Sequence, residues 1–150
     1  MPNLAVDCIV TKQRQSDGGI DILLITRGSE PFEHCHAFPG GFVRYGESPR
    51  VACLRELEEE CSVKGVDPEL ITVAGEPERD PRKHVVSIAY AVEVDPSAEV
   101  KAASDAATAK WYDLKTVWDS FDLAFDHRDI LKEFLEKKHP EVLNSNRRSD

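Results

Sequence analysis

Three glutamates on one expected helix have the residue type and spacing that metal binding requires. Glu56, Glu59 and Glu60 belong to the run RVACLRELEEEC at residues 50–61, which contains strong helix formers throughout. At about 100° per residue, their carboxylates fall within an arc of roughly 100° on one face of the helix. Another face carries an apolar stripe suited to a core, formed by Cys53, Leu54, Leu57 and Cys61.

This grouping of like charges calls for an explanation, because carboxylates at positions i and i+4 repel one another and destabilise a helix. Mg²⁺ provides one, since it takes oxygen ligands, commonly one or two carboxylates together with phosphate oxygens and water. Metal ions that bridge a diphosphate would neutralise its charge, orient it and acidify an attacking water. The alternative is a solvated acidic face, which is the commoner meaning of consecutive glutamates on a helix.

The segments that flank this helix are expected to fix its position. Ser48 is a good N-cap, and Pro49 suits the first helical position, where its missing N–H costs nothing. The helix should end near residues 62–65. The preceding segment, residues 28–47, is rich in Gly, Pro and His and is interpreted as a long loop broken by a short strand. Loops of that length in a compact domain are usually functional or disordered.

Several strands and one more helix complete the expected fold. The strands are predicted at residues 4–11, 20–26, 70–75, 84–94 and 110–114, with the first two forming a hairpin. A polar and Ala-rich loop is expected at 95–108. A second helix is predicted at 126–138, with Asp126 as its cap and His139 followed by Pro140 at its end. This order predicts an α/β fold in which helices pack on the faces of a mixed sheet.

The spacing around the glutamates resembles a known signature. It consists of Gly41, five residues, Glu47, seven residues, the run RELEEE at 55–60, and Val63. The pattern resembles the Nudix box of the Nudix hydrolases, and every fixed position matches except Ser62, where the family has Gly. The fold that this resemblance implies is an α/β/α sandwich around a mixed β-sheet.

The resemblance also implies roles for individual residues. The metal, Mg²⁺ with Mn²⁺ as an alternative, would be bound by three side chains and one main-chain carbonyl, those of Glu56, Glu59, Glu60 and Gly40. One of the carboxylates would also be the base that activates water. Glu47 and Arg55 would complete the catalytic set by forming an ion pair that holds the loop and helix together.

Ser62 is the departure from the family pattern. The family's Gly supplies a turn after the helix with φ above zero, a conformation that disfavours Ser by about 1 kcal/mol. Either Ser62 is strained, or the helix ends differently and Gly65 takes the turn. The carboxylates lie upstream of this position and should be little affected.

Segments outside the box resemble the ADP-ribose pyrophosphatase branch of the family. The same segments occur in the Nudix-like domain of some transcription repressors of NAD metabolism. They are FPGGFV at 38–43, DPR at 80–82 ahead of VSIAY at 86–90, and LAFDH at 123–127. The resemblance makes four residues candidates for substrate binding: Arg27, Arg82, Phe125 and His127.

Each candidate also has a purely structural alternative. Arg82 would bind phosphate through its guanidinium fork or pair with a neighbouring aspartate. Arg27 would contact phosphate or be a surface charge. Phe125 is interpreted as a core residue or an adenine-stacking surface, and His127 as a capping, packing or catalytic group. The run HCH at 34–36 is interpreted as loop, because a structural zinc site requires four ligands.

The function implied is hydrolysis of ADP-ribose, or of a related nucleoside diphosphate conjugate, to AMP and ribose 5-phosphate. One alternative is a nucleoside triphosphate pyrophosphohydrolase that sanitises the nucleotide pool. Another is a sensor that binds ADP-ribose without cleaving it. The similar repressors carry an added DNA-binding module, for which this chain is expected to have no spare length. A vestigial structural domain is disfavoured, because no carboxylate of the box is lost.

Composition narrows the expected partners and location. A net charge of −9 repels nucleic acid, so the predicted partner is a small-molecule nucleotide. No apolar run has the length of a membrane span and the N-terminus lacks a secretory signal, so a cytoplasmic protein without membrane association is expected. The four cysteines match no disulfide framework and are expected to be reduced.

The expected organisation is one Nudix hydrolase domain at residues 1–140, followed by a polar, mobile tail at 141–150. Relatives in the family often form homodimers, so a homodimer is expected here too.

Overall fold

The computed structural model describes residues 1–144. A mixed β-sheet forms the centre of the molecule. The sheet has the strand order β3-β2-β1-β6-β5, while β4 pairs with β1 and β7 pairs with β2. Strands β1 and β6 are parallel, and the other pairs are antiparallel. The strands are β1 Asn3–Gln13, β2 Ile20–Arg27, β3 His36–Ala37, β4 Gly40–Phe42, β5 Gly65–Ala74, β6 Val85–Val94 and β7 Ala106–Asp113.

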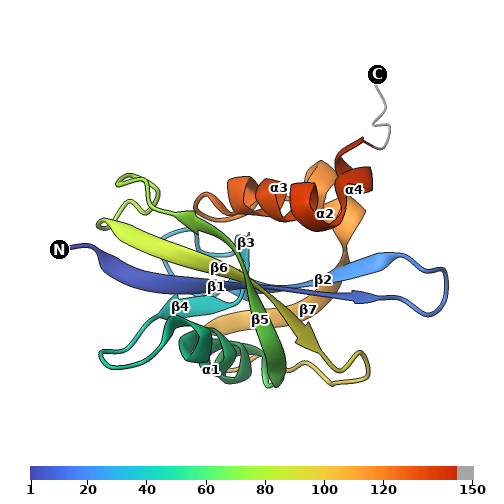
Figure 1. The fold of residues 1–150 in the computed structure, drawn as a ribbon, viewed down its shortest axis with the longest axis horizontal. Helices are drawn as coiled ribbons and strands as arrows, with labels where there is room; N and C mark the ends of the chain where they lie inside the picture. The colour runs from blue at the N-terminus through green and yellow to red at the C-terminus, as the bar shows by residue number, and fades with distance from the viewer. Residues whose placement is uncertain (145–150) are drawn as a thin grey trace.

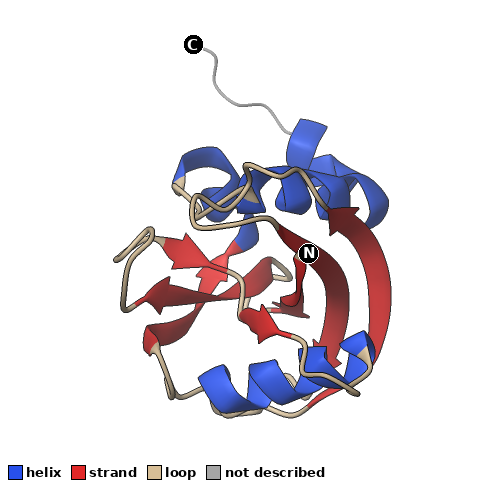
Figure 2. Ribbon diagram, turned by 90° about the vertical axis from the view of Figure 1, so that its left-hand side faces the viewer, coloured by secondary structure: helices blue, strands red, loops and turns tan. Residues whose placement is uncertain are grey.

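Helices cover both faces of this sheet (Figures 1 and 2). Helix α1, Pro49–Cys61, lies on one face, and the helices α2 Leu114–Ser120, α3 His127–Lys138 and α4 Pro140–Asn144 lie on the other. The expected α/β/α sandwich with a mixed sheet is therefore confirmed. None of the helices in the described part of the chain is long and apolar enough to cross a membrane.

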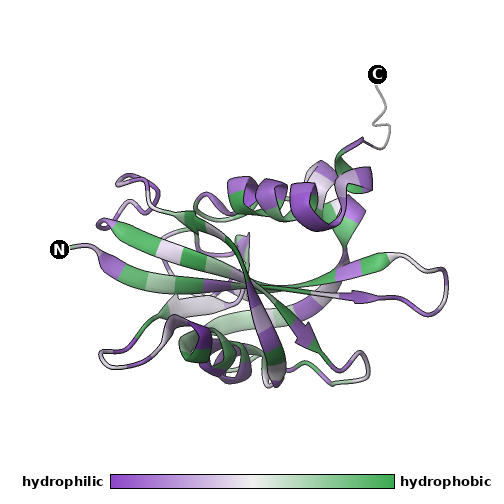
Figure 3. Cartoon of the chain, viewed as in Figure 1, coloured by the Kyte–Doolittle hydropathy of each residue, from purple (hydrophilic) through white to green (hydrophobic). Residues whose placement is uncertain are grey.

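Two hydrophobic cores separate the three layers. Along β1, the side chains of Val6, Cys8 and Val10 pack in the core beneath α1, while Ile9 packs in the core beneath α3. This alternation is the period of two that an extended strand imposes on its side chains. Figure 3 shows the resulting bands of hydrophobic and polar residues along the central strands. Asp7 interrupts this apolar pattern, because it is charged and buried.

Helix α1 begins where the sequence predicts and ends with an unusual residue. The Ser48 hydroxyl accepts a hydrogen bond from the Arg50 N–H at 3.2 Å, and Pro49 occupies the first turn. At the other end, Ser62 itself adopts the left-handed conformation, with φ of 62°. Its hydroxyl donates to the Lys101 carbonyl at 3.2 Å, and this bond compensates for part of the strain. Gly65 does not take the turn but begins β5.

The boundaries of two strands differ from the prediction. Strand β7 begins at residue 106, inside the segment 95–108 that was expected to be a loop, because its small residues pair with β2 up to Arg27. Strand β5 begins at residue 65 rather than 70, since it pairs with β6 through irregular register shifts. In both cases the partner strand decides the conformation, and the local pattern does not reveal the partner.

The helices differ from the prediction at three places. Helix α2 was not expected; Asp113 caps it by accepting the Thr116 N–H at 3.0 Å. Asp126 occupies the N-cap position of α3 as predicted, but its side chain makes no capping hydrogen bond because its carboxylate binds Arg79. Residues 141–144 of the expected tail belong to α4, whose apolar residues pack against the core beneath α3. The rest of the predicted tail, 145–150, lies outside the described residues.

Candidate active site

A cleft of about 370 Å³ contains the side chains that are able to bind a metal ion or a substrate. Its lining includes three glutamates of α1, three arginines from β2 and from the segment between β5 and β6, the first residue of α3 and a phenylalanine just before that helix. They are Glu56, Glu59, Glu60, Arg27, Arg79, Arg82, Phe125 and His127. The fold therefore brings together every side chain predicted to bind metal or substrate. The two remaining residues of the predicted catalytic set, Glu47 and Arg55, do not line the cleft.

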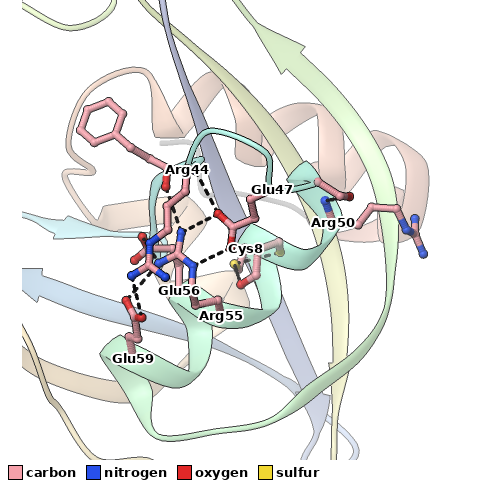
Figure 4. Close-up of polar contacts among 10 residues, drawn as sticks. Cys8, Arg44, Glu47, Arg50, Arg55, Glu56 and Glu59 are labelled. Carbon is pink, nitrogen blue, oxygen red and sulfur yellow. Dashed lines mark hydrogen bonds and ion pairs between the residues drawn. The ribbon is translucent and has the colours of Figure 1, made fainter.

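Arg55 links the carboxylates of the loop and the helix (Figure 4). Its Nε and Nη2 donate to the two carboxylate oxygens of Glu47 at 2.7 and 2.9 Å. Its Nη1 donates to Glu56 and Glu59, each at 3.1 Å, and its Nη2 also reaches the Phe42 carbonyl. The predicted ion pair between Glu47 and Arg55 is thus present. The hydrogen bonds from Arg55 lower the pKa of Glu47 to about 2.

Two adjacent glycines let carboxylates approach the main chain of β4 from opposite faces. A Cβ on Gly41 would overlap the carboxylate of Glu56, and a Cβ on Gly40 would lie 2.9 Å from Oδ1 of Asp7 and overlap the Val6 carbonyl. Successive residues of a strand point to opposite faces of the sheet. Glu56 therefore packs against β4 from the α1 side and Asp7 from the α3 side, and larger residues would block both contacts.

The hydrogen-bond pattern of β4 also orients the main chain of Gly40. Cys8 N–H donates to the Pro39 carbonyl at 2.8 Å, and Val43 N–H donates to the Leu4 carbonyl at 2.9 Å. By the alternation of an antiparallel pair, the pairing of Gly40 with Asp7 is one without hydrogen bonds. The Gly40 N–H instead donates to Oε1 of Glu60 at 2.8 Å. In a regular strand the carbonyl of such a residue lies on the same side as its N–H, so strand geometry predicts that the Gly40 carbonyl also faces away from β1.

Burial raises the pKa of two glutamates in the cleft. It raises the pKa of Glu60 to about 8, with the Gly40 N–H opposing that shift and the charge of Glu56 adding to it. Burial also raises the pKa of Glu56, although Arg55 opposes the shift. Low-dielectric surroundings disfavour the ionised carboxylate, and an adjacent cation would reverse that preference.

The donors around the cleft suit a hard divalent cation. The four predicted ligands are all oxygens, three from carboxylates and one from the Gly40 carbonyl, and Mg²⁺ and Mn²⁺ bind such oxygens. No three acidic, His or Cys side chains in residues 1–144 already converge on one metal position. In the described arrangement, Glu56 and Glu59 are bound by Arg55, and Glu60 by the Gly40 N–H. A bound ion would have to replace some of these contacts.

The cationic part of the cleft is built around Phe125. The guanidinium carbon of Arg27 lies 4.9 Å from the ring centroid, and that of Arg82 lies 5.9 Å away. Arg27 is anchored by a 2.7 Å hydrogen bond from its Nε to the Pro31 carbonyl. Burial lowers its pKa, although a guanidinium stays charged near neutral pH. Phe125 itself packs on Phe32, with ring centroids 4.8 Å apart, so it is both a core residue and a wall of the cleft.

Arg82 pairs with a neighbouring aspartate, as its structural alternative predicts, and remains available to a ligand. Its Nε and Nη2 donate to the carboxylate of Asp80 at 3.0 and 2.7 Å. This pairing lowers the pKa of Asp80. The Arg82 side chain keeps 44% of its surface exposed and lines the cleft. Pairing with Asp80 and contact with phosphate are therefore compatible.

His127 lines the cleft with both ring nitrogens already engaged. Its Nδ1 accepts the Phe38 N–H at 3.2 Å, and its Nε2 lies 3.3 Å from Oδ1 of Asp7. The ring stacks on Phe38 with centroids 4.7 Å apart. The run at 34–36 is loop followed by the start of β3, and it forms no metal cluster with other described residues.

Sequence reasoning did not identify several polar residues of the cleft. Asp7, Ser87 and Arg79 are largely buried there, and Asp105 reaches it from the segment before β7. For Asp7, the available signal was a charged residue inside an otherwise apolar strand. For Arg79, whose guanidinium pairs with Asp126 at 2.7 Å, the partner lies 47 positions away in sequence, and no local pattern connects the two.

Comparison with known proteins extends these observations. Residues 1–134 match the family model described as the NUDIX domain. The chain is 40% identical over 138 residues to an ADP-ribose pyrophosphatase of Methanocaldococcus jannaschii, an alignment that covers 92% of this chain and 76% of the relative. It is 31% identical over 134 residues to the ADPR-responsive transcriptional repressor NtrR of Acinetobacter baylyi, covering 88% of this chain and only 52% of the repressor.

Solved structures share the fold closely. The NUDIX domain of Shewanella oneidensis NrtR, in a cocrystal with ADP-ribose, superposes with a TM-score of 0.82 at 26% identity, covering 91% of this chain and 88% of that domain. A MutT/nudix family protein from Enterococcus faecalis also gives a TM-score of 0.82, at 29% identity, covering 95% of this chain and 66% of the other.

Proposed function

Because this chain belongs to the Nudix family, we propose that it is a diphosphatase that hydrolyses ADP-ribose to AMP and ribose 5-phosphate. The observation that carries the proposal is the composition of the cleft, which combines the three α1 carboxylates with Arg27 and Arg82. A diphosphate substrate requires both a way to hold divalent cations and a way to bind phosphate oxygens directly. The 40% identity to an ADP-ribose pyrophosphatase supports the choice of substrate.

The acidic side of the cleft would hold the metal, Mg²⁺ or Mn²⁺. The ligands would be Glu56, Glu59, Glu60 and the Gly40 carbonyl. The bound ion would neutralise the diphosphate and acidify a water molecule. One of the three carboxylates would accept the proton of that water as it attacks phosphorus. Arg55, held by Glu47, would keep Glu56 and Glu59 on the same side of the helix.

The cationic side of the cleft would bind the substrate. Arg27 and Arg82 would donate to phosphate oxygens, because a guanidinium offers paired donors that match the geometry of phosphate. Phe125, which contacts both guanidinium groups and Phe32, would hold the arginines in place and offer its ring to the nucleotide. The ring of His127 would form part of the wall, since its nitrogens are engaged by the protein.

A sensor that binds ADP-ribose without cleaving it is the second candidate. It is favoured by the likeness to the NUDIX domain of Shewanella oneidensis NrtR, solved with ADP-ribose, and to the ADPR-responsive repressor of Acinetobacter baylyi. The intact set Glu56, Glu59 and Glu60, with Glu47 and Arg55, favours turnover instead.

A substrate panel tests the proposal and separates the candidates. Purified protein and Mg²⁺ are incubated with ADP-ribose, NADH, diadenosine polyphosphates and 8-oxo-dGTP, and AMP or phosphate-ester release is followed. We expect kcat/KM for ADP-ribose to lie within about 10⁴–10⁸ M⁻¹s⁻¹ and to exceed the other values clearly. Faster turnover of 8-oxo-dGTP would identify a nucleotide-pool enzyme. Tight ADP-ribose binding without AMP release would identify a sensor.

We further propose that the protein works in the cytoplasm as a homodimer, with a small-molecule nucleotide and no nucleic acid as its partner. Free thiols at all four cysteines support a reducing compartment. Strand β5, at one end of the sheet path, exposes Val66, Leu70 and Val73 to more than half of their full extent, and such apolar exposure favours burial against a second copy. The net charge of −9 opposes nucleic-acid binding. Light scattering on the purified protein tests the dimer.

A further inference from the structure

The buried polar side chains of the described chain are concentrated around one position. Four of its polar or charged side chains are buried, Asp7, Asp80, Ser87 and His127, and all four line the cleft. Burial of a polar group is costly unless it is hydrogen-bonded, so such a concentration indicates a purpose. Three of the four are connected to one another, and we call Asp7, Ser87 and His127 the Asp7 network.

The hydrogen bonds of the Asp7 network have a defined direction. The Phe38 N–H donates to Nδ1 of His127, so the ring proton of the neutral imidazole lies on Nε2. Nε2 therefore donates to Oδ1 of Asp7, 3.3 Å away. The Ser87 hydroxyl donates to Oδ2 of the same carboxylate at 2.5 Å. Asp7 thus accepts from two buried donors that come from two different elements, α3 and β6.

The network reaches the metal end of the cleft through residues 38–40. His127 holds this segment at the Phe38 N–H, Cys8 holds it at the Pro39 carbonyl, and the Asp7 carboxylate packs against Gly40. On the opposite side, the Gly40 N–H binds Glu60. Gly40 therefore lies between the Asp7 network and Glu60 of α1, and the strand geometry that directs its N–H to Glu60 predicts the same side for its carbonyl.

We propose that Asp7, Ser87 and His127 are positioning residues that hold residues 38–40 so that the Gly40 carbonyl stays directed at the metal site. None of the three is a metal ligand or a proton donor to substrate in this proposal. Hydrogen-bonded partners behind metal ligands orient them, and their loss typically weakens metal binding or activity about 10–100-fold. The inference rests on the metal-binding part of the proposed function and is independent of the identity of the substrate.

Direct metal binding without substrate tests the proposal. The dissociation constant for Mn²⁺ is measured by calorimetry or by electron paramagnetic resonance of the free ion, and the melting temperature of each protein is recorded alongside. His127→Phe keeps an aromatic ring against Phe38 but removes both hydrogen bonds, and we expect it to weaken Mn²⁺ binding about 10-fold or more. Ile130→Val, a buried change on the same helix, should lower the melting temperature but leave Mn²⁺ affinity unchanged.

A second pair of variants separates positioning from a direct role of the Asp7 charge. Asp7→Asn keeps an acceptor for His127, and its amide can donate to the Ser87 hydroxyl, so its Mn²⁺ affinity should stay within a few-fold of wild type. Asp7→Ala removes both contacts and should match His127→Phe. If Asp7→Asn lost as much affinity as Asp7→Ala, the charge itself would bind the metal, and the positioning role would be wrong.

Two further outcomes would also overturn the inference. If His127→Phe and Asp7→Ala lowered the melting temperature but left Mn²⁺ affinity unchanged, the network would contribute only to packing. A wild-type protein that bound no Mn²⁺ would remove the metal assignment and the inference together. If the variants changed Mn²⁺ affinity as expected but the protein did not hydrolyse ADP-ribose, the inference would stand and the proposed substrate would be rejected.

Discussion

The acidic and cationic sides of the cleft are assembled in different ways. The carboxylates of the acidic side come from one helix, and Arg55 on that same helix joins Glu56 and Glu59 to Glu47. The arginines of the cationic side come from β2 and from the segment before β6, and they meet only around Phe125, which precedes α3. The first arrangement is a property of local sequence, and the second is a property of the tertiary fold. The variants below are therefore expected to separate catalytic rate from substrate affinity.

The largest effect is expected on the acidic side, from Glu60→Gln. This change keeps the shape and the hydrogen bond from the Gly40 N–H but removes the charge that would bind the metal. We expect kcat to fall roughly 10²–10³-fold, the size typical of removing a preorganised group that stabilises charge. The measurement is AMP release from ADP-ribose. Glu58→Gln, at an exposed position of the same helix outside the cleft, is the matched control and should retain activity. A Glu60→Gln rate within a few-fold of wild type would show that Glu60 is not a metal ligand.

The next effect is expected at the contact between β4 and α1. In Gly41→Ala the new methyl group would overlap the Glu56 carboxylate and displace it. We expect kcat to fall about 10-fold or more, because small misplacements of positioned groups are costly to catalysis. Gly75→Ala is the control, since its added Cβ would come no closer than 3.8 Å to a neighbouring atom. Equal activity of the two variants would mean that β4 does not constrain Glu56.

A different kinetic signature is expected on the cationic side, from Arg82→Ala. Loss of one charge-assisted contact to phosphate should raise KM for ADP-ribose about 10-fold while changing kcat much less. Steady-state kinetics measure both parameters, and Lys132→Ala on the exposed side of α3 is the control. A fall in kcat with an unchanged KM would show that Arg82 acts on the catalytic rate, as the carboxylates do. The proposed contrast between the two sides of the cleft would then be wrong.

The same contrast explains which features were predictable from sequence. The helix, its Ser48 cap and the facing of Glu56, Glu59 and Glu60 follow from spacing within a dozen residues, and all were predicted. Helix α2 and the early start of β7 were missed, because partner segments distant in sequence decide them.

Two further misses show the same limit. The Asp7 network joins β1, β6 and α3, and although Asp7 is a charged residue in an apolar strand, no local pattern connects it to Ser87 or His127. Asp126 is the N-cap residue of α3, but its carboxylate binds Arg79 in place of the helix N–H groups, and that partner becomes visible only in the fold.

A smaller effect is expected in the pH dependence of stability of the metal-free protein. The pKa of Glu60 is about 8 in the folded chain, against an ordinary value of 4.5. As pH rises from 4.5 toward 8, the unfolded chain releases this proton while the folded chain retains it, so the free energy of unfolding decreases over that window. Urea denaturation at a series of pH values in EDTA would measure the decrease. Glu60→Gln should show a flatter profile, and a wild-type profile just as flat would contradict this account of Glu60.

Removal and return of the metal tests the central claim most directly. Release of AMP from ADP-ribose is measured for the purified wild-type protein in Mg²⁺, after EDTA treatment, and after Mg²⁺ is restored. The account predicts kcat/KM within about 10⁴–10⁸ M⁻¹s⁻¹ with Mg²⁺, loss of activity in EDTA, and recovery on return of the ion. Absence of AMP under all three conditions, or turnover that persists unchanged in EDTA, would contradict it.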